Sequence, residues 1–351
     1  MSSSKAPRVH IVILNWNGWK DTQECLESVF RQDYDNYQIV VCDNDSQDES
    51  VEHILAWAKG QEQAPNPGDH PLAKYSQPPI PKPVSHICLN RDTAEKGVQI
   101  PQETELVVIR TGGNLGFAGG NNVGFRYALQ QQACDYIWLL NNDTVVAPDA
   151  LKQMVAHSRE LDNQGIPNTC GNTVCFYDDP NIVQALGGAS FNRWTGIATE
   201  TLGRFLPLND EIDHASHLEK LDYITGCSWL LPRAFLDEIG LMEEGYFLYY
   251  EEIDWVLRSK HKYQLNYAPD AYIYHKEGSS IGSKTMNRKS SLLSDFYMAR
   301  NKFRVAAKFN PMMLLTVFLS TFLQALNRVR QGHPEKAWLL IKVMFGKQNY
   351  P

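Results

Sequence analysis

The sequence predicts an α/β fold with a mostly parallel central sheet, followed by C-terminal helices. Through the first half of the chain, apolar runs of strand length alternate with amphipathic segments of helical period. From about residue 290 onward the pattern is helical throughout. The 351 residues leave room for one large domain or two modest ones. The 43% hydrophobic and 21% charged content is typical of a folded globular protein, so wholesale disorder is excluded.

Four apolar strands and three helices account for the regular part of the first half. The expected strands are residues 9–15, 37–43, 105–110 and 136–140. The expected helices between them are residues 19–32, 49–59 and 119–131. Buried strands that alternate with amphipathic helices form right-handed βαβ units, and such units place their strands parallel to one another.

One segment, residues 60–104, interrupts this alternation. It contains eight of the eighteen prolines, between Pro65 and Pro101, and it has no sustained strand or helix period. Because proline fixes φ and removes a hydrogen-bond donor, we predict an extended surface insertion rather than core. This composition fits a variable surface insertion without a specific role, and it also fits a lid or a loop that docks a partner.

The second half is mixed before it becomes helical. Short strands are expected around residues 172–176 and 223–231, a helix near Tyr250, and extended segments at 264–268 and 271–275. Helices follow at 291–309, 312–329 and 335–344. We therefore expect one domain over residues 1–289, with the proline-rich insertion inside it, and a helical extension over residues 290–351.

Net charge, cysteine pattern and apolar runs indicate which partners and which compartment to expect. The net charge of −7 argues against binding of nucleic acid through bulk positive charge. Seven cysteines with no C-x-x-C pair and no zinc-ligand spacing predict free thiols in a reducing cytoplasm. The apolar run 9–14 is too short for a signal-peptide core, and the stretch 312–326 falls short of the roughly 20 residues of a spanning helix. Lys308 precedes that stretch and Arg328 follows it, which fits a helix on the inner face of the cytoplasmic membrane as well as a helix packed on the domain.

Polar clusters directly follow three of the expected strands, where a parallel sheet binds its ligands. The first, residues 43–48, begins with Asp43 and Asn44 and has more polar side chains than a helix cap needs. The second, residues 112–124, has six glycines that allow a ligand close to the backbone, or form a plain turn. Its spacing is neither G-x-G-x-x-G nor a P-loop. The third, residues 141–143, ends in Asp143, which could bind a hard divalent cation or cap a helix.

Two more candidate clusters lie in the second half. Glu251, Glu252 and Asp254 open a predicted helix, on which Glu251 and Asp254 share a face and Glu252 points elsewhere. Asp254 can pair with Arg258 four residues on. Repulsion and burial would raise one carboxyl pKa toward the range of a general base, and a solvated acidic helix start is the alternative. His275 ends an extended segment, where it could bind a metal ion or serve the structure.

Taken together, these stretches resemble the nucleotide-sugar glycosyltransferases of family 2, which have the GT-A fold, and in particular their rhamnosyltransferase-like branch. The matching stretches, in chain order, are VHIVILNWNG, VVCDNDSQDES, NLGFAGGNNVG, WLLNNDTVV, ITGCSWLLPR, YFLYYEEIDWVLR and YIYHKEGSSIG. The later stretch FYMARNKFRVAAKF resembles the same branch. The resemblance implies a GT-A glycosyltransferase domain over residues 1–289.

The resemblance also implies roles for the polar clusters. The donor nucleotide would be bound by Asn15, Asp43, Asn44, Asn114, Gly116, Asn122 and Asn142. Residues 141–143 occupy the Asp-x-Asp position of the family, so a divalent cation, Mn²⁺ or Mg²⁺, would be held by Asp143, His275 and Asn141. Because asparagine stands at 141 in place of the first aspartate, we expect either a lower affinity for the cation or a cation held mostly through the diphosphate. Glu252 occupies the position of the family's catalytic base, and Glu251 and Asp254 are the neighbouring candidates.

We therefore expect inverting, metal-dependent transfer from a nucleoside-diphosphate sugar, with dTDP-rhamnose as a candidate donor. The acceptor would be a hydroxyl of a glycan or lipid-linked molecule in cell-surface polysaccharide synthesis. Two other hypotheses stay open. A sugar nucleotidyltransferase would release pyrophosphate, and a non-catalytic nucleotide- or sugar-binding module would bind without turnover.

Overall fold

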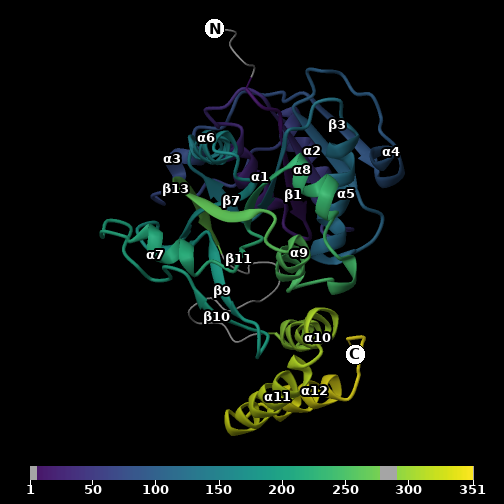
Figure 1. Ribbon diagram of the computed structural model, residues 1–351. Coiled ribbons are helices and arrows are strands. Elements are labelled where there is room, and N and C mark those ends of the chain that lie inside the picture. Colours follow the sequence, from purple (N-terminus) through teal and green to yellow (C-terminus); the bar gives the residue numbers. More distant parts are fainter. Residues whose placement is uncertain (1–5, 277–290, 351) are drawn as a thin grey trace.

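The computed structural model describes residues 6–276 and 291–350, and a ten-stranded sheet forms the centre of this part (Figure 1). In spatial order its strands are β3 (His86–Asn90), β4 (Leu106–Arg110), β2 (Tyr37–Asp43), β1 (Val9–Asn15), β5 (Tyr136–Asn141), β12 (Ser228–Pro232), β7 (Asn168–Phe176), β13 (Gln264–His275) and β6 (Thr144–Val146). A further strand, β8 (Val183–Leu186), pairs with β7. The run from β3 to β5 is parallel, and so is the pair β7 and β13. Since only β12, β6 and β8 run antiparallel to their neighbours in this sheet, the prediction of a mostly parallel sheet is confirmed.

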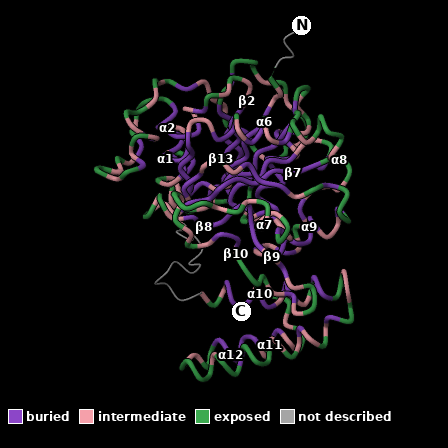
Figure 2. The backbone as a smooth tube through the Cα atoms, turned by 60° about the vertical axis from the view of Figure 1, so that its left-hand side comes forward, coloured by how far each residue is buried: buried purple, intermediate pink, exposed green. Residues whose placement is uncertain are grey.

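Helices cover both faces of the sheet. One face is covered by α1 (Trp19–Val29), α2 (Ser50–Lys59) and α6 (Ala150–Asn163), and the other by α5 (Gly116–Gln130), α8 (Arg233–Ile239) and α9 (Glu251–Ser259). Successive side chains of a strand point to opposite faces, so Ile11 and Ile13 of β1 pack under the first group and Val12 under the second. Figure 2 shows the buried strands enclosed between these layers. Short helices complete the domain: α3 (Ala73–Ser76), α4 (Arg91–Glu95), α7 (His214–Glu219) and the 3-10 turn η1 (Glu244–Tyr246).

The prediction that residues 60–104 lie outside the sheet is wrong for His86–Asn90. These residues form β3, which pairs in parallel with β4 at the edge of the sheet. Only Leu89 of the strand is buried. The other parallel strands are recognised by a continuous apolar run. A partly exposed edge strand needs no such run, so the sequence does not reveal β3.

The segment 223–231 forms two strands rather than the one predicted. The first part, β11 (Tyr223–Ile224), belongs to a separate antiparallel sheet with β9 (Gly188–Asn192) and β10 (Ile197–Thr201). The second part is β12 of the central sheet. The three residues between β11 and β12, numbers 225–227, therefore connect the two sheets. All three line the cavity described below.

The C-terminal extension forms three helices packed on one another at one end of the molecule (Figure 1). They are α10 (Leu292–Phe309), α11 (Met313–Arg330) and α12 (Pro334–Met344), which agrees closely with the predicted bounds. Ser291 caps α10, since its side chain accepts a hydrogen bond from the Ser294 backbone N–H. Within residues 6–276 and 291–350, no helix combines the length and the apolar character needed to cross a bilayer.

Candidate active site

A cavity of about 990 Å³ lies at the carboxyl ends of the central strands, between the sheet and the C-terminal helices. Its sheet side is lined by the residues that follow β1, β2 and β5 and by the crossing segment between β11 and β12. Its other side is lined by the start of α9 and by residues of α10 and α11. Of the predicted site residues, the cavity is lined by Asn44, Asn114, Gly116, Asn141, Asn142, Asp143, Glu251, Glu252 and His275.

Asp143 and His275 meet in this cavity although they are far apart in the sequence. The pairing of β13 with β6 sets His275 beside Thr144, and therefore next to Asp143. The His275 Nε2 atom lies 3.1 Å from Asp143 Oδ1 and 3.5 Å from Asn141 Nδ2. On the other side of the ring, Nδ1 lies 2.9 Å from Gln184 Oε1. When Nδ1 donates its proton to that oxygen, Nε2 is the nitrogen left to bind a cation.

Electrostatics favour a negative charge on Asp143. Burial would by itself raise the pKa of the Asp143 carboxyl, but when His275 is protonated its charge and hydrogen bond outweigh burial. A bound cation would replace the proton on Nε2 and act on Asp143 in the same direction. The net pKa therefore lies below its ordinary value. Asp143 thus stays ionised at neutral pH, the state in which a carboxylate binds a divalent cation.

Glu251 and Glu252 both line the cavity from the first turn of α9, whereas Asp254, which was expected to share a face with Glu251, does not. The Gly226 backbone N–H donates to Glu252 Oε1 at 3.2 Å. Glu251 is buried, and its Oε2 atom has no hydrogen-bond partner within the described residues. Burial raises the pKa of both carboxyls, and the charge of Glu252 raises that of Glu251 further. Two adjacent carboxyls with raised pKa values are typical of sites that transfer protons.

Asp254, the third predicted candidate for the base, does not reach the cavity. Its fully buried carboxylate accepts hydrogen bonds from Arg258 Nε at 2.6 Å, Lys308 Nζ at 2.6 Å and the Tyr246 hydroxyl at 3.0 Å. Asp254 thus ties α9 to α10 and to η1. The structure therefore supports the alternative weighed from the sequence, in which Asp254 pairs with Arg258.

We expect Asp254→Ala to lower the free energy of unfolding by about 3–5 kcal/mol, because it leaves two cations without their buried counter-charge. Urea unfolding followed by circular dichroism measures this loss. The matched control is Asp237→Ala, which removes an exposed i,i+4 pair with Arg233 and should cost less than about 1 kcal/mol. Equal stability of the two variants would contradict the structural role of Asp254.

The residues predicted to bind the nucleotide divide into two groups. Asn44 and Asn114 line the cavity and bind each other, with Asn44 Nδ2 3.0 Å from Asn114 Oδ1. Asn15 and Asp43 lie beneath the floor, where Asn15 Nδ2 donates to Asp43 Oδ1 at 2.8 Å. Asn142 lines the cavity, and its amide reaches the same network through Thr22. We infer that Asn15 and Asp43 stabilise the backbone under the cavity and do not contact the ligand.

Gly116 and Asn122, from the glycine-rich cluster, both contact the loop before α9. Gly116 has φ +71°, and a Cβ there would lie 2.3 Å from the Phe247 carbonyl oxygen, so only glycine fits. Asn122 is fully buried outside the cavity lining, and it donates to the Met242 carbonyl and to Glu244 Oε1. The structure thus corrects the prediction for Asn122, which braces this loop instead of lining the donor pocket.

A contact between α10 and the loop before α9 was missed by sequence reasoning. The loop contains three non-glycine residues with positive φ, namely Phe247, Tyr249 and Tyr250. The buried Asn301 amide donates to the carbonyls of Tyr246, Leu248 and Tyr249 at 3.0, 2.7 and 2.8 Å. These bonds stabilise a strained backbone. The only sequence signal was the resemblance of FYMARNKFRVAAKF, which contains Asn301.

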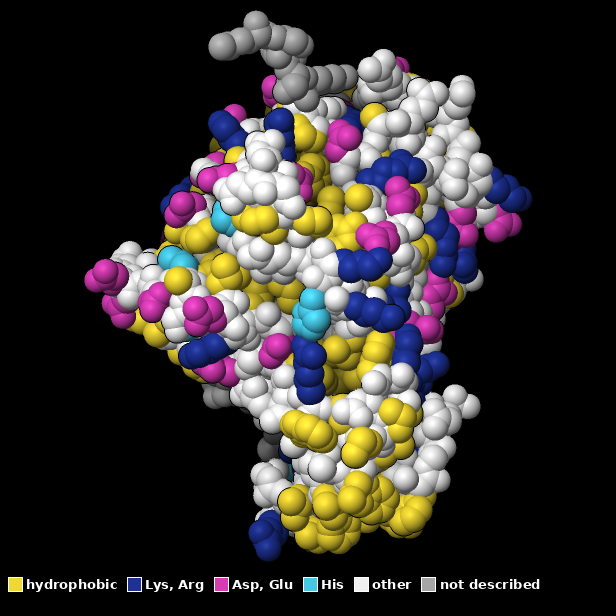
Figure 3. All heavy atoms as spheres, in the orientation of Figure 1, with side chains coloured by type: hydrophobic (Ala, Val, Ile, Leu, Met, Phe, Trp, Pro, Cys, Tyr) yellow, Lys and Arg dark blue, Asp and Glu magenta, His cyan; other side chains and the backbone are white. Residues whose placement is uncertain are grey.

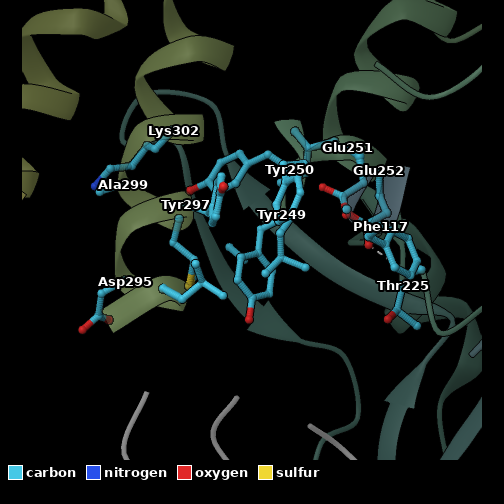
Figure 4. A pocket seen from close by; sticks show the side chains of 18 of the residues that line it. Phe117, Thr225, Tyr249, Tyr250, Glu251, Glu252, Asp295, Tyr297, Ala299 and Lys302 are labelled. Atoms are coloured by element: carbon cyan, nitrogen blue, oxygen red, sulfur yellow. Dashed lines mark hydrogen bonds between the residues drawn. The ribbon is translucent and has the colours of Figure 1, made fainter. Parts of the chain in front are cut away.

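The cavity thus has two sides that come from distant parts of the chain (Figure 4). In Figure 4, Tyr249 and Tyr250 stand in the middle, with Glu251, Glu252, Phe117 and Thr225 on one side and Asp295, Tyr297, Ala299 and Lys302 of α10 on the other. The first side contains the carboxyls of α9. The second side is formed by the C-terminal extension.

This fold is that of the GT-A glycosyltransferases. The structure of GalNAc-T7 with UDP, GalNAc and Mn²⁺ matches 87% of this chain and 48% of that chain, with a TM-score of 0.52 and 16% identity. The mannosyltransferase PcManGT from Pyrobaculum calidifontis, in complex with GDP-Man and Mn²⁺, matches 98% of this chain and 77% of that chain, with a TM-score of 0.49 and 13% identity.

The chain belongs to glycosyl transferase family 2, whose model matches residues 10–67 and 91–240. The unmatched residues 68–90 lie within the proline-rich segment. The low-salt glycan biosynthesis hexosyltransferase Agl10 of Haloferax volcanii is 24% identical over 166 residues, or 44% of this chain. The match spans 47% of that relative, about half its length. The rhamnosyltransferase-like branch stays a prediction.

Proposed function

We propose that this protein transfers a sugar from a nucleoside-diphosphate sugar to an acceptor hydroxyl, with inversion at the anomeric carbon. The observation that carries the proposal is the meeting of Asp143 and His275 in a cavity that Glu252 also lines. Membership of glycosyl transferase family 2 supports it. The donor is proposed to lie against Asn44, Asn114 and Asn142.

We assign Glu252 as the general base that takes the proton from the acceptor hydroxyl. As the acceptor oxygen bonds to the anomeric carbon, a Glu252 carboxylate oxygen accepts the hydroxyl proton. The bond from the anomeric carbon to the diphosphate oxygen breaks, and its electron pair leaves with the diphosphate. A carboxylate whose pKa is raised by burial is a stronger base, and the Gly226 N–H bond fixes its position. Attack opposite the leaving group inverts the anomeric configuration.

The donor atoms around Asp143 fit a divalent cation. A carboxylate oxygen and an imidazole nitrogen converge there, and the combination suits Mn²⁺ as well as Mg²⁺. Bound there, the cation would neutralise charge on the departing diphosphate. Within the described residues no group of three His, Cys, Asp or Glu side chains is placed to hold a metal ion, so we expect the diphosphate and water to complete the coordination.

A donor panel tests the proposed function. Nucleoside-diphosphate sugars, dTDP-rhamnose among them, are incubated with candidate acceptors and with Mn²⁺, Mg²⁺ or EDTA, and release of nucleoside diphosphate is measured. We expect cation-dependent release with at least one donor and a product of inverted configuration by NMR. Release of pyrophosphate from a nucleoside triphosphate would instead support a nucleotidyltransferase. Binding of every donor without turnover would support a binding module.

The acceptor is proposed to be glycan or lipid-linked, and the protein to contact the cytoplasmic membrane surface. Along one side of α11, large apolar side chains are exposed, and more follow on α12; Figure 3 shows them gathered at the end of the molecule. They are Leu315, Leu319, Phe322, Leu323, Leu326 and Val329 of α11, Trp338 of α12, and the flanking residues Met312 and Phe345. Residues 290–351 also contain nine Lys and Arg against two Asp and Glu. A basic segment with an exposed apolar face is suited to an anionic bilayer surface.

We expect the intact protein to float with vesicles of phosphatidylglycerol and phosphatidylcholine, and the triple variant Leu315→Ser, Leu319→Ser, Leu323→Ser to float several-fold less. The matched control is Phe205→Ser, which removes an exposed apolar side chain from the domain surface. Flotation that is equal for the triple variant and the control, or absent for the wild type, would refute the membrane contact.

A further inference from the structure

The cavity does not end at the two glutamates but continues between α10 and α11. Its far end is lined by Tyr297 and Lys302 of α10, by Gln324, Asn327 and Arg328 of α11, and by Gln331, which directly follows α11. These last four residues recur at spacings of three and four, so they lie along one side of the helix and its C-cap. The adjacent face of the same helix carries the exposed leucines described above. The far end of the cavity therefore combines these polar side chains with apolar ones, Leu293, Met298 and Leu340.

Lys302 is the unusual residue of this far end. Its side chain is 2% exposed, and its stem lies against Gly196, where a Cβ would come within 2.8 Å of Lys302 Cγ. Among the described residues, the hydrogen-bond partners of the ammonium group are two neutral atoms, Ser320 Oγ and Gln324 Oε1, each at 3.4 Å. Of the residues that the structure describes, no carboxylate oxygen lies within 4.0 Å of it. Burial lowers the pKa of Lys302 to about 8.

Two other largely buried lysines have carboxylate partners. Lys276 Nζ lies 2.6 Å from both Asp21 and Glu24, and Lys336 Nζ lies 3.1 Å from Asp295. Asp295 also binds Arg328 at 3.0 Å, so two cations already share this carboxylate. The far end of the cavity therefore contains more positive than negative charge among its described residues. A buried lysine without a counter-charge costs stability, which favours a role in binding an anion.

We propose that the far end of the cavity binds a phosphate group carried by the acceptor, with Lys302 as its cationic contact. The proposal rests on the proposed function, because it places the acceptor between α10 and α11 and its hydroxyl toward Glu252. A phosphate oxygen would accept from the Lys302 ammonium group, and Gln324, Asn327 and Gln331 would offer amide donors. Phosphate of this kind could come from a lipid-linked acceptor or from a soluble sugar phosphate.

Calorimetry in EDTA tests the proposal with hexyl phosphate, inorganic phosphate and neutral hexyl glucoside as probes. EDTA removes any phosphate bound through a cation at Asp143. We expect hexyl phosphate to bind more tightly than hexyl glucoside, and Lys302→Met to weaken hexyl phosphate about tenfold to a hundredfold. The control Lys342→Met removes an exposed charge of the same extension and should change nothing. Hexyl phosphate binding that is equal in the wild type and Lys302→Met would overturn the proposal.

Two further readouts separate the possible outcomes. Lys302→Met should melt at or above the wild-type temperature, because it removes a buried charge but keeps the length of the stem. If it unfolds, Lys302→Gln provides the same binding comparison. Hexyl phosphate binding more tightly than inorganic phosphate indicates a lipid-linked source, and equal binding indicates a soluble one. Binding of nucleoside diphosphates with Mn²⁺ is measured in parallel: its absence removes the proposed function, whereas its presence with unchanged hexyl phosphate binding removes only the phosphate site.

Discussion

Glu252→Gln is expected to lower kcat for sugar transfer by about 10²–10⁴-fold, the range that general-base catalysis contributes. Glutamine keeps the size of the side chain, but it cannot accept the hydroxyl proton. Since Glu252 acts on the acceptor, binding of the nucleoside diphosphate should change little. Transfer is measured as product formed at saturating donor, and nucleotide binding by calorimetry.

Glu251→Gln is the matched control, since it removes the neighbouring carboxyl and leaves Glu252 in place. It should reduce transfer much less, and it should leave the pKa of Glu252 nearly unchanged, because burial and the charge of Glu252 keep Glu251 protonated where Glu252 titrates. Burial raises the pKa of Glu252 above its ordinary 4.5, and the base must be ionised to act. The acid limb of the kcat/KM profile is therefore expected above pH 4.5 in the wild type, with activity rising as pH rises through it. Near-wild-type turnover of Glu252→Gln, with Glu251→Gln inactive, would reassign the base to Glu251.

Asp143→Ala is expected to abolish the stimulation of transfer by Mn²⁺ or Mg²⁺ and to lower kcat at least about 10²-fold. The variant removes the carboxylate oxygen that lies 3.1 Å from His275 Nε2, so the two protein ligands become one. His275→Ala should weaken the response to the cation in the same direction. Higher Mn²⁺ concentrations should partly restore activity to His275→Ala, because the carboxylate is still present.

Asp149→Ala is the matched control for this effect, since Asp149 is a nearby carboxylate at the start of α6 outside the cavity lining. Its cation response should equal that of the wild type. A folded Asp143→Ala variant with an unchanged cation response would show that the cation, if needed, binds elsewhere.

The sequence was sufficient to predict the parts of the fold that depend on local pattern. The strands β1, β2, β4 and β5 are buried on both faces, so each appears as a continuous apolar run. The C-terminal helices were found by their period. The edge strand β3 was missed because its half-exposed residues lack such a run, and β11 was merged with β12 because two short strands in different sheets are contiguous in sequence.

Site residues were harder to predict because a polar side chain can serve either the ligand or the scaffold. Asp143 and His275 come together as expected, since strand pairing fixes both. Asn122 and Asp254 belong to other stretches of the same resemblance, yet their hydrogen bonds go to loop backbone, to Glu244 and to the cations Arg258 and Lys308. Nor does any local pattern reveal that Asn301 binds three carbonyls more than fifty residues away. Contacts of this kind depend on the complete fold.

The arrangement has a consequence for the C-terminal helices. The loop before α9 has an unfavourable backbone, and α10 supplies the amide that stabilises it. The same helix contributes Lys302 and Tyr297 to the cavity. The C-terminal extension therefore contributes to the proposed site in two ways. It stabilises the loop from which α9 and Glu252 begin, and it lines the part of the cavity proposed for the acceptor.

The most direct test is a crystal structure of the protein soaked with Mn²⁺ and a nucleoside diphosphate, with the ion located by its anomalous signal. We expect one peak bonded to Asp143 Oδ1 and His275 Nε2, a diphosphate oxygen in its coordination sphere, and the Glu252 carboxylate facing the same space. An ion held by neither residue, or a Glu252 side chain turned out of the cavity, would contradict the proposed mechanism.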